Sequence, residues 1–264
     1  MTNPFGSRGK VLIGVVHLPP LPGSPRWEGD LSAVLRSAVK DARAYEQGGA
    51  HAIFIENFGD APFTKGSVAP ETIASMAAAG CAVGAAVKIP FGFNVLRNDA
   101  CAALALCTAC GGSFIRVNVH TGAMLTDQGL IEGRAYETLR YRQRLCPAVR
   151  IFADVHVKHA VPLGDWRIDQ AARDTLARGL ADALIVSGPG TGLAADVVEV
   201  ERVRAACEGA KLLLGSGVTV ENARTYLRLA DGLIVGTSLK QGGNVAKPVD
   251  EKRVASLARL VRQS

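Results

Sequence analysis

The amino-acid sequence predicts a single (β/α)8 TIM barrel, an α/β fold, on three observations. Eight short apolar runs alternate with helical patterns along the chain, and a length of 264 residues suits one such barrel. The residues are 48% hydrophobic but only 5% aromatic, which favours parallel strands under helices over a β-sandwich. No linker divides the chain, so we expect one domain over residues 1–264, with its core at about 11–260.

The expected strands are short runs of aliphatic residues, and the expected helices have apolar residues three and four positions apart. Strands are predicted at residues 11–17, 52–57, 85–89, 114–120, 151–158, 183–187, 212–215 and 232–235. Helices are predicted at 31–47, 71–79, 99–109, 135–145, 169–178, 196–207 and 220–229. The segments that leave the strands are long, and active sites of such barrels lie on these segments. Segments that enter strands are short and often contain glycine, as at Gly80.

Two middle strands, 114–120 and 151–158, carry aliphatic residues on one face and charged residues on the other. Because the aliphatic face of a barrel strand packs under helices, the charged face points into the barrel. Buried charges are costly unless they are paired or used. The expected catalytic residues on these and two further strands are Glu56, Lys88, Asp154, His156 and Lys158. A structural ion-pair ladder across the barrel is the alternative interpretation of these charges.

Four further residues are expected to bind substrate. Arg116 and Asn118 share the inner face of their strand. Arg97 precedes two residues suited to cap a helix but has no capping role itself, so it is a candidate clamp for an anion. His17 ends the first strand, where a hydrogen-bonded structural histidine is an equal alternative.

Glycine ends the last two predicted strands, and hydroxyl residues follow. A glycine here lets backbone N–H groups approach an anion, and the segments after strands seven and eight are the usual phosphate site of this barrel. The expected phosphate-binding residues are Gly215, Ser216, Gly217, Gly236, Thr237 and Ser238. The alternative is that both glycines only permit tight turns.

Composition and charge restrict the kinds of partner and the compartment that are expected for this protein. The net charge of +6 is dispersed, so no nucleic-acid partner is expected. No apolar run of about twenty residues predicts a membrane span, and the polar residues 1–10 predict a cytoplasmic protein. The six cysteines are expected to be free thiols. Cys107 and Cys110 are expected to pack a helix, and a metal-binding or redox pair is the less favoured alternative. No cofactor is required, although two inner carboxylates leave room for a divalent metal. A homodimer is compatible with the sequence.

Motifs along the chain resemble those of the BtpA/SgcQ family. They are residues 17–23 (HLPPLPG), 56–60 (ENFGD), 96–99 (LRND), 116–119 (RVNV), 126–129 (TDQG), 157–160 (VKHA), 215–219 (GSGVT) and 235–240 (VGTSLK). The resemblance runs from about Val11 to Arg253 and implies a ribulose-phosphate-binding barrel. It also implies two functions: the family is named for a member implicated in photosystem I biogenesis, whereas other members look like enzymes of sugar metabolism.

From the residues and this resemblance, the expected function is that of an enzyme. Its substrate would be a phosphosugar or phosphoribosyl compound, and its acid–base chemistry would be of the isomerase, epimerase or lyase type. The alternative is a non-catalytic biogenesis or stability factor for a membrane complex such as photosystem I.

Overall fold

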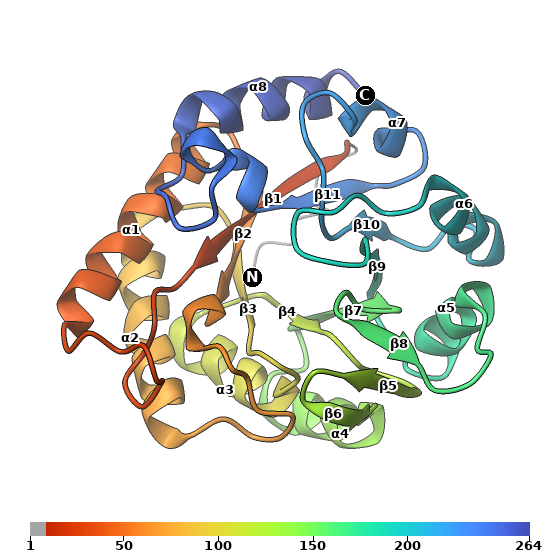
Figure 1. The fold of residues 1–264 in the computed structure, drawn as a ribbon, viewed down its shortest axis with the longest axis horizontal. Coiled ribbons are helices and arrows are strands. Elements are labelled where there is room, and N and C mark those ends of the chain that lie inside the picture. The colour runs from red at the N-terminus through yellow and green to blue at the C-terminus, as the bar shows by residue number, and fades with distance from the viewer. Residues whose placement is uncertain (1–8) are drawn as a thin grey trace.

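Eight parallel strands close into a barrel within residues 9–264, the part of the chain that the computed structural model describes (Figure 1). In barrel order they are β1 (Val11–His17), β11 (Gly232–Val235), β10 (Leu212–Leu214), β9 (Ala183–Val186), β7 (Arg150–Val155), β4 (Phe114–Val117), β3 (Phe91–Asn94) and β2 (Ala52–Glu56). The predicted fold class is therefore confirmed.

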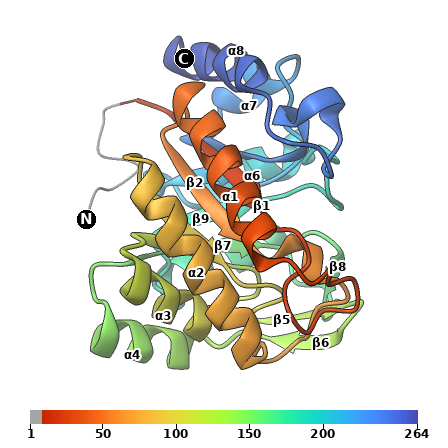
Figure 2. The same cartoon turned by 90° about the vertical axis from the view of Figure 1, so that its left-hand side faces the viewer.

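Helices cover the outside of the barrel (Figures 1 and 2). They are α1 (Leu31–Gln47), α2 (Pro70–Ala86), α3 (Ala100–Cys110), α4 (Ala135–Leu145), α5 (Ile168–Ala177), α6 (Val197–Ala206), α7 (Ala223–Leu227) and α8 (Glu251–Arg262). Asp30, Asp99, Asp196 and Asp250 cap four of these helices by accepting hydrogen bonds from first-turn N–H groups. Among the described residues, no helix is long and apolar enough to cross a membrane. Residues 1–8, on which much of the cytoplasmic prediction depends, lie outside the described range.

The barrel closes where β1 pairs with β11, in the register Val11 to Gly232. Tyr45 of α1 contacts both strands of this seam: its buried hydroxyl lies 3.1 Å from the carbonyl oxygen of Val15 in β1 and 3.5 Å from that of Val235 in β11. Gly14 makes room for the Tyr45 ring: a Cβ at Gly14 would lie 2.4 Å from that ring. The first and last strands are thus locked together by a helix that follows the first.

An aromatic layer fills the lower barrel interior. Phe54, Phe114 and Phe152 are fully buried, and the last two rings stack with their centroids 5.2 Å apart. Two residues further along β2 and β4 stand Glu56 and Arg116. Since strand side chains alternate with a period of two, the apolar layer and the polar layer above it share the inner face. The charged residues therefore lie at the carboxyl ends of the strands, directly above the layer of buried aromatic side chains.

The third strand was predicted wrongly. Residues 85 and 86 end α2, and β3 begins only at Phe91. Gly80 lies inside α2 and does not mark a turn: a Cβ there would lie 2.5 Å from Phe93, so the glycine lets the helix pack closely on β3. Lys88 consequently lies in the short connection that enters β3, with its side chain exposed and its N–H donating to Glu46.

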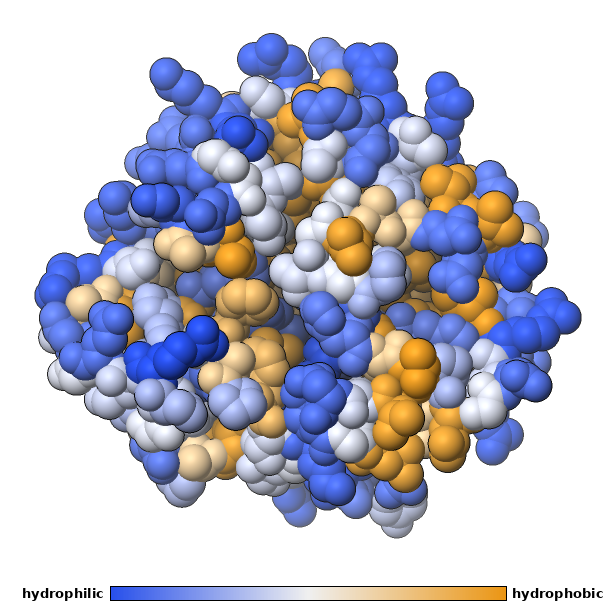
Figure 3. Space-filling view, in the orientation of Figure 1, coloured by the Kyte–Doolittle hydropathy of each residue, from blue (hydrophilic) through white to orange (hydrophobic). Residues whose placement is uncertain are grey.

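A small antiparallel sheet covers one side of the barrel mouth. It consists of β6 (Gly129–Glu132), β5 (Ala123–Thr126) and β8 (Ala160–Pro162), in segments that follow β4 and β7 and for which no strand was predicted. Figure 2 shows this sheet at one end of the barrel. Its outer face carries exposed Leu125, Leu130 and Val161, which are cross-strand neighbours, and Figure 3 shows apolar surface over it.

Candidate functional site

A cavity of about 220 Å³ opens at the carboxyl ends of the strands. Side chains from four places in the sequence line its polar wall: His17, Glu56, Arg116 and Lys158. The segments after β10 and β11 also line it, with Gly215 to Thr219 and Gly236 to Ser238. Of the residues predicted to be catalytic, Glu56 and Lys158 line this cavity, together with His17 and Arg116 of the predicted substrate-binding residues and the two predicted phosphate segments.

Arg116 and Asp154 form a bidentate ion pair beside this cavity. The guanidinium donates to the two carboxylate oxygens at 2.8 and 2.7 Å, and both residues are about 95% buried. Asn118 donates to the same carboxylate at 3.0 Å and Ser187 at 3.1 Å. Each carboxylate oxygen of Asp154 therefore accepts two hydrogen bonds. Asp154 holds Arg116 and has no free lone pair aimed at a ligand, which agrees with the structural ion-pair alternative for this residue.

Glu56 is buried, and one of its oxygens accepts a hydrogen bond from Asn94 at 2.6 Å. Its other oxygen lies 4.0 Å from Nε2 of His17. Burial raises the pKa of this carboxyl, but the positive charges of Lys158 and Arg116, with the Asn94 hydrogen bond, outweigh burial, so the pKa of Glu56 lies below its ordinary value. Glu56 is therefore a carboxylate at neutral pH, and its charge faces the cavity.

His17 is held as a neutral imidazole. Burial lowers its pKa to about 4, and Lys240 and Lys158 add to the decrease, although Glu56 opposes it. Phe58 packs against the ring with centroids 4.6 Å apart. Its Nδ1 is buried and has no hydrogen-bond partner within the described chain. A neutral imidazole with one free nitrogen can donate to, or accept from, a ligand oxygen.

Lys158 follows β7 and extends toward the cavity. Within residues 9–264, its ammonium makes no hydrogen bond or ion pair shorter than 4.0 Å. Burial lowers its pKa, Arg116 and Arg97 lower it further, and the charges of Glu56 and Asp154 partly offset them. Arg97 is buried and donates to the main-chain carbonyl of Lys158, while its Nε has no partner in the described chain. Arg97 thus fixes the backbone that carries the lysine.

The two glycine-ended segments line the cavity, and the hydroxyls of their serines are engaged within the protein. Ser216 uses its hydroxyl internally, because it accepts from the N–H of Gly188 at 2.8 Å and donates to Leu193. Ser238 likewise donates to the carbonyl of Val218 at 2.6 Å. A Cβ at Gly215 would lie 3.1 Å from Arg116, so glycine there keeps the guanidinium face clear. The hydroxyls of both serines brace the two segments against each other and against the segment after β9.

Two predicted catalytic residues are not part of this cluster. Lys88 lies at the opposite, amino-terminal end of the strands, because its strand was misplaced by several residues. His156 lies after the end of β7 in a left-handed conformation with φ of +52°, so the alternation of the strand no longer applies to it. Its ring is hydrogen-bonded at the backbone of Trp166, and burial lowers its pKa.

Sequence reasoning missed two members of the polar layer, Asn94 and Ser187. Asn94 was hidden by the misplaced third strand; the run of Phe91, Gly92 and Phe93 before it carried the alternation that would have revealed it. Among the described residues, no group of three His, Cys, Asp or Glu side chains could hold a metal ion. Both oxygens of Asp154 accept hydrogen bonds from Arg116, Asn118 and Ser187, whereas Glu56 accepts one from Asn94 and keeps its other oxygen free of a hydrogen bond in the described chain.

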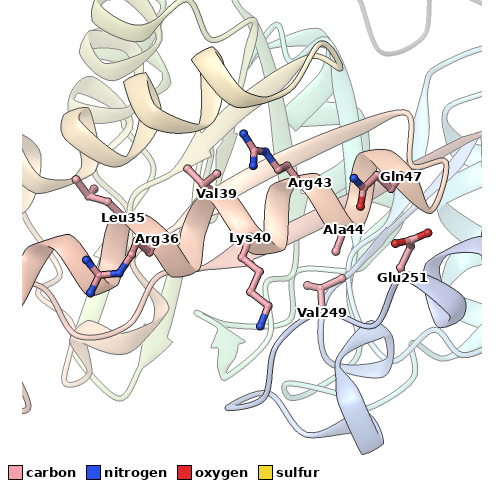
Figure 4. A pocket seen from close by; sticks show the side chains of 9 residues that line it. All are labelled: Leu35, Arg36, Val39, Lys40, Arg43, Ala44, Gln47, Val249 and Glu251. Atoms are coloured by element: carbon pink, nitrogen blue, oxygen red, sulfur yellow. The ribbon is translucent and has the colours of Figure 1, made fainter.

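A larger hollow lies on the outside of the barrel, along α1 (Figure 4). Figure 4 shows Arg36, Lys40 and Arg43 on the exposed face of this helix, with Val249 and Glu251 opposite. This hollow has basic side chains but none of the acid–base groups that meet at the barrel mouth. The smaller mouth cavity is therefore the better candidate for a chemical site.

Comparisons with known proteins agree with the fold and the motifs. The model of the BtpA family matches residues 8–263. The Photosystem I biogenesis protein BtpA of Synechocystis sp. is 47% identical, over 93% of this chain and 85% of its own length. The sgc region protein SgcQ of Escherichia coli K12 is 33% identical, over 96% of this chain and 94% of its own.

Solved structures with the same fold are more distant. Phosphoribosyl anthranilate isomerase from Thermus thermophilus superposes with a TM-score of 0.58 at 17% identity, over 94% of this chain and 96% of its own. The native KDPGal structure superposes with a TM-score of 0.60 at 14% identity, over 96% and 94%. At these sequence identities the superpositions show only that the barrel fold is shared.

Proposed function

Given that the chain belongs to the BtpA family, we propose that it is an enzyme acting on a phosphosugar or a phosphoribosyl compound by acid–base chemistry. The observation that carries this proposal is the mouth cavity, in which an unpaired Lys158 faces two glycine-ended backbone segments. An ammonium without a partner at hydrogen-bond distance is costly in a protein interior and is explained by a ligand that it contacts.

In this proposal the phosphate lies against Gly215 to Gly217 and Gly236 to Ser238. Backbone N–H groups and Arg116 would donate to it, and Asp154 would keep the guanidinium in place. The superposed phosphoribosyl anthranilate isomerase acts on a phosphorylated compound, as its name states, and this adds support.

The acid–base groups of the proposal are Lys158, His17 and Glu56. Lys158, with a lowered pKa, would move a proton at the carbon or oxygen under reaction, and neutral His17 would hydrogen-bond an adjacent substrate oxygen. The Glu56 carboxylate would steady the ammonium and accept from a sugar hydroxyl. Such a set suits an isomerase, an epimerase or a lyase. No cofactor is needed for these steps.

A charge substitution tests the phosphate site. Thr237 lines the cavity, and its side chain makes no hydrogen bond within the described chain that would be lost. Thr237→Glu places a carboxylate beside the proposed phosphate, whereas Thr237→Gln has nearly the same shape without the charge. We expect ribose 5-phosphate to bind the Glu variant at least tenfold more weakly than the Gln variant in calorimetric titration. Equal affinities in the two folded variants would place the phosphate elsewhere.

A second candidate function, a biogenesis factor, is favoured by the name of the Synechocystis relative. The two candidates differ in which residues they need. An assembly factor binds through its surface, so Glu56→Gln with Lys158→Met should leave it active, while Arg140→Ala with Arg144→Ala on exposed α4 should not. An enzyme requires the reverse. Complementation of a deletion strain by the two double variants decides between them.

The proposal has further parts that simple measurements check. It places the enzyme in the cytoplasm, with a phosphorylated small molecule as its ligand and not nucleic acid. A fluorescent fusion would report the location. Light scattering after gel filtration would report whether the chain is a homodimer. Added chelator should leave turnover unchanged.

A further inference from the structure

A second cavity adjoins the candidate active site. Its volume is about 680 Å³, against about 220 Å³ for the mouth cavity, and His17 lines both. It lies between the segment after β1, the first half of α1 and the segment that joins β11 to α8. Figure 1 shows these two segments on the same side of the barrel, beside α1. A ligand that contacts His17 in the mouth cavity therefore lies next to the second cavity.

The walls of this second cavity are largely aromatic and apolar. Trp27 and Phe58 line it with prolines from both segments: Pro19, Pro20 and Pro248. Trp27 is half-buried against the core, and the ring of Phe58 rests on that of His17. Rigid aromatic rings in a cavity wall suit a flat ligand group, because stacking on them needs little loss of side-chain freedom.

The charges in the second cavity balance. Three cations, Arg26, Lys240 and Lys247, are offset by three carboxylates, Glu28, Asp30 and Asp41. At its floor, buried Lys240 donates to Asp41 at 2.6 Å, and Asp41 also accepts from the N–H of Val249. The Lys240 ammonium and both oxygens of the Asp41 carboxylate therefore already have partners within the protein.

The mouth cavity differs in its electrostatics: Arg116 is paired with Asp154, but the Lys158 ammonium has no partner at hydrogen-bond distance in the described chain. In the second cavity the buried cation, Lys240, is already paired with Asp41, and the other two cations, Arg26 and Lys247, are exposed. The group that the second cavity accommodates best is uncharged.

From these four observations we infer that the substrate has two parts, a phosphorylated sugar in the mouth cavity and a flat aromatic or heteroaromatic group in the cavity lined by Trp27 and Phe58. The inference rests on the proposed phosphate site and narrows the substrate class to aromatic conjugates of a phosphosugar. The bond between the two parts then lies beside His17, within reach of Lys158 and Glu56.

Calorimetric titration with four probes tests this inference. Ribose 5-phosphate carries the phosphosugar alone, and adenosine monophosphate, uridine monophosphate and nicotinamide mononucleotide add three different aromatic groups to it. We expect at least one of these three to bind ten times more tightly than ribose 5-phosphate. Stacking on an aromatic side chain typically contributes a gain of this order.

Substitutions assign the gain to the second cavity. Ser37 is exposed on α1 and lines this cavity, so Ser37→Phe fills it without disturbing the core. This variant should lose the tenfold gain and keep its affinity for ribose 5-phosphate. Trp27→Leu should act in the same direction. Lys40→Phe, on the outer face of the same helix, is the matched control and should keep the gain.

The outcomes separate this inference from the proposal on which it rests. If ribose 5-phosphate binds but none of the aromatic compounds binds more tightly, the two-part substrate is wrong and the phosphate site stands. The same conclusion follows if Ser37→Phe weakens all four probes equally. If none of the four compounds binds the wild-type protein, the proposed phosphosugar function is wrong, and the inference that depends on it is wrong as well.

Discussion

Replacement of Asp154 should lower the stability of the protein, whereas replacement of Lys158 should lower ligand affinity and leave stability nearly unchanged. Asp154→Asn removes the charge that pairs with Arg116, and the guanidinium is only 4% exposed. A buried ion left without its partner costs about 3–5 kcal/mol. For a chain of this size, each kcal/mol lowers the melting temperature by roughly 2–4 °C. The Asp154→Asn protein should therefore melt on the order of 10 °C below the wild type.

Lys158→Met should change stability little, within about 1 kcal/mol, because the ammonium has no partner at hydrogen-bond distance in the described chain and burial already disfavours its charge. The Glu56 carboxylate keeps its hydrogen bond from Asn94. Scanning calorimetry measures both variants, and titration with ribose 5-phosphate gives their affinities. Lys158→Met should retain the fold and lose ligand affinity. The reasoning is refuted if Lys158→Met melts as low as Asp154→Asn, since Lys158 would then be a structural ion-pair partner.

Three further predictions concern single groups. His17 has a folded-state pKa of about 4 against an ordinary 6.5, so the unfolded chain takes up its proton first and stability falls as pH drops from about 6.5 to 4, by up to about 3 kcal/mol. Denaturant unfolding should show that His17→Gln reduces this loss, and an unchanged pH slope would contradict the assigned pKa. Glu56→Gln removes a charge that raises the pKa of Lys158, so this pKa should fall further; a titration by NMR that shows no change would mean that the two charges do not interact. Exposed Cys81 should react with a thiol reagent well before buried Cys107, whose pKa is raised by burial, and mass spectrometry of the labelled peptides gives the order.

The alternation of side chains was enough to predict the inner face of the barrel where strands are regular. Glu56, Arg116 and Asp154 stand two residues beyond the buried Phe54, Phe114 and Phe152, and that spacing is visible in the sequence. It failed where the backbone leaves the strand conformation, as at His156 with its positive φ. A one-residue change of local conformation is enough to redirect a side chain, and no periodicity encodes it.

The third strand failed for a different reason. Residues 85–89 alternate as a strand would, but Gly80 and Gly84 in the preceding segment serve close helix packing on Phe93 and Phe91 and are not turn residues. A glycine that permits close packing and one that permits a turn look the same in a sequence.

The ion-pair partner of Asp154 could not be predicted from the sequence either. Asp154 could pair with Lys158, four residues further along the chain, or with Arg116 on the neighbouring strand. Only the register of β4 against β7 selects Arg116.

The closure of the barrel between β1 and β11 affects how the site comes into existence during synthesis. The mouth cavity takes His17 from the first strand and Gly236 to Ser238 from the end of the last. A nascent chain must therefore hold its amino-terminal strand in a folding-competent state until the final strand has left the ribosome and α8 can pack on α1. Until then, the edges of β1 and of the newest strand are unpaired and open to association with other chains. Ligand affinity thus appears only with the finished protein, so truncated products that end before residue 236 should neither bind nor compete for the ligand.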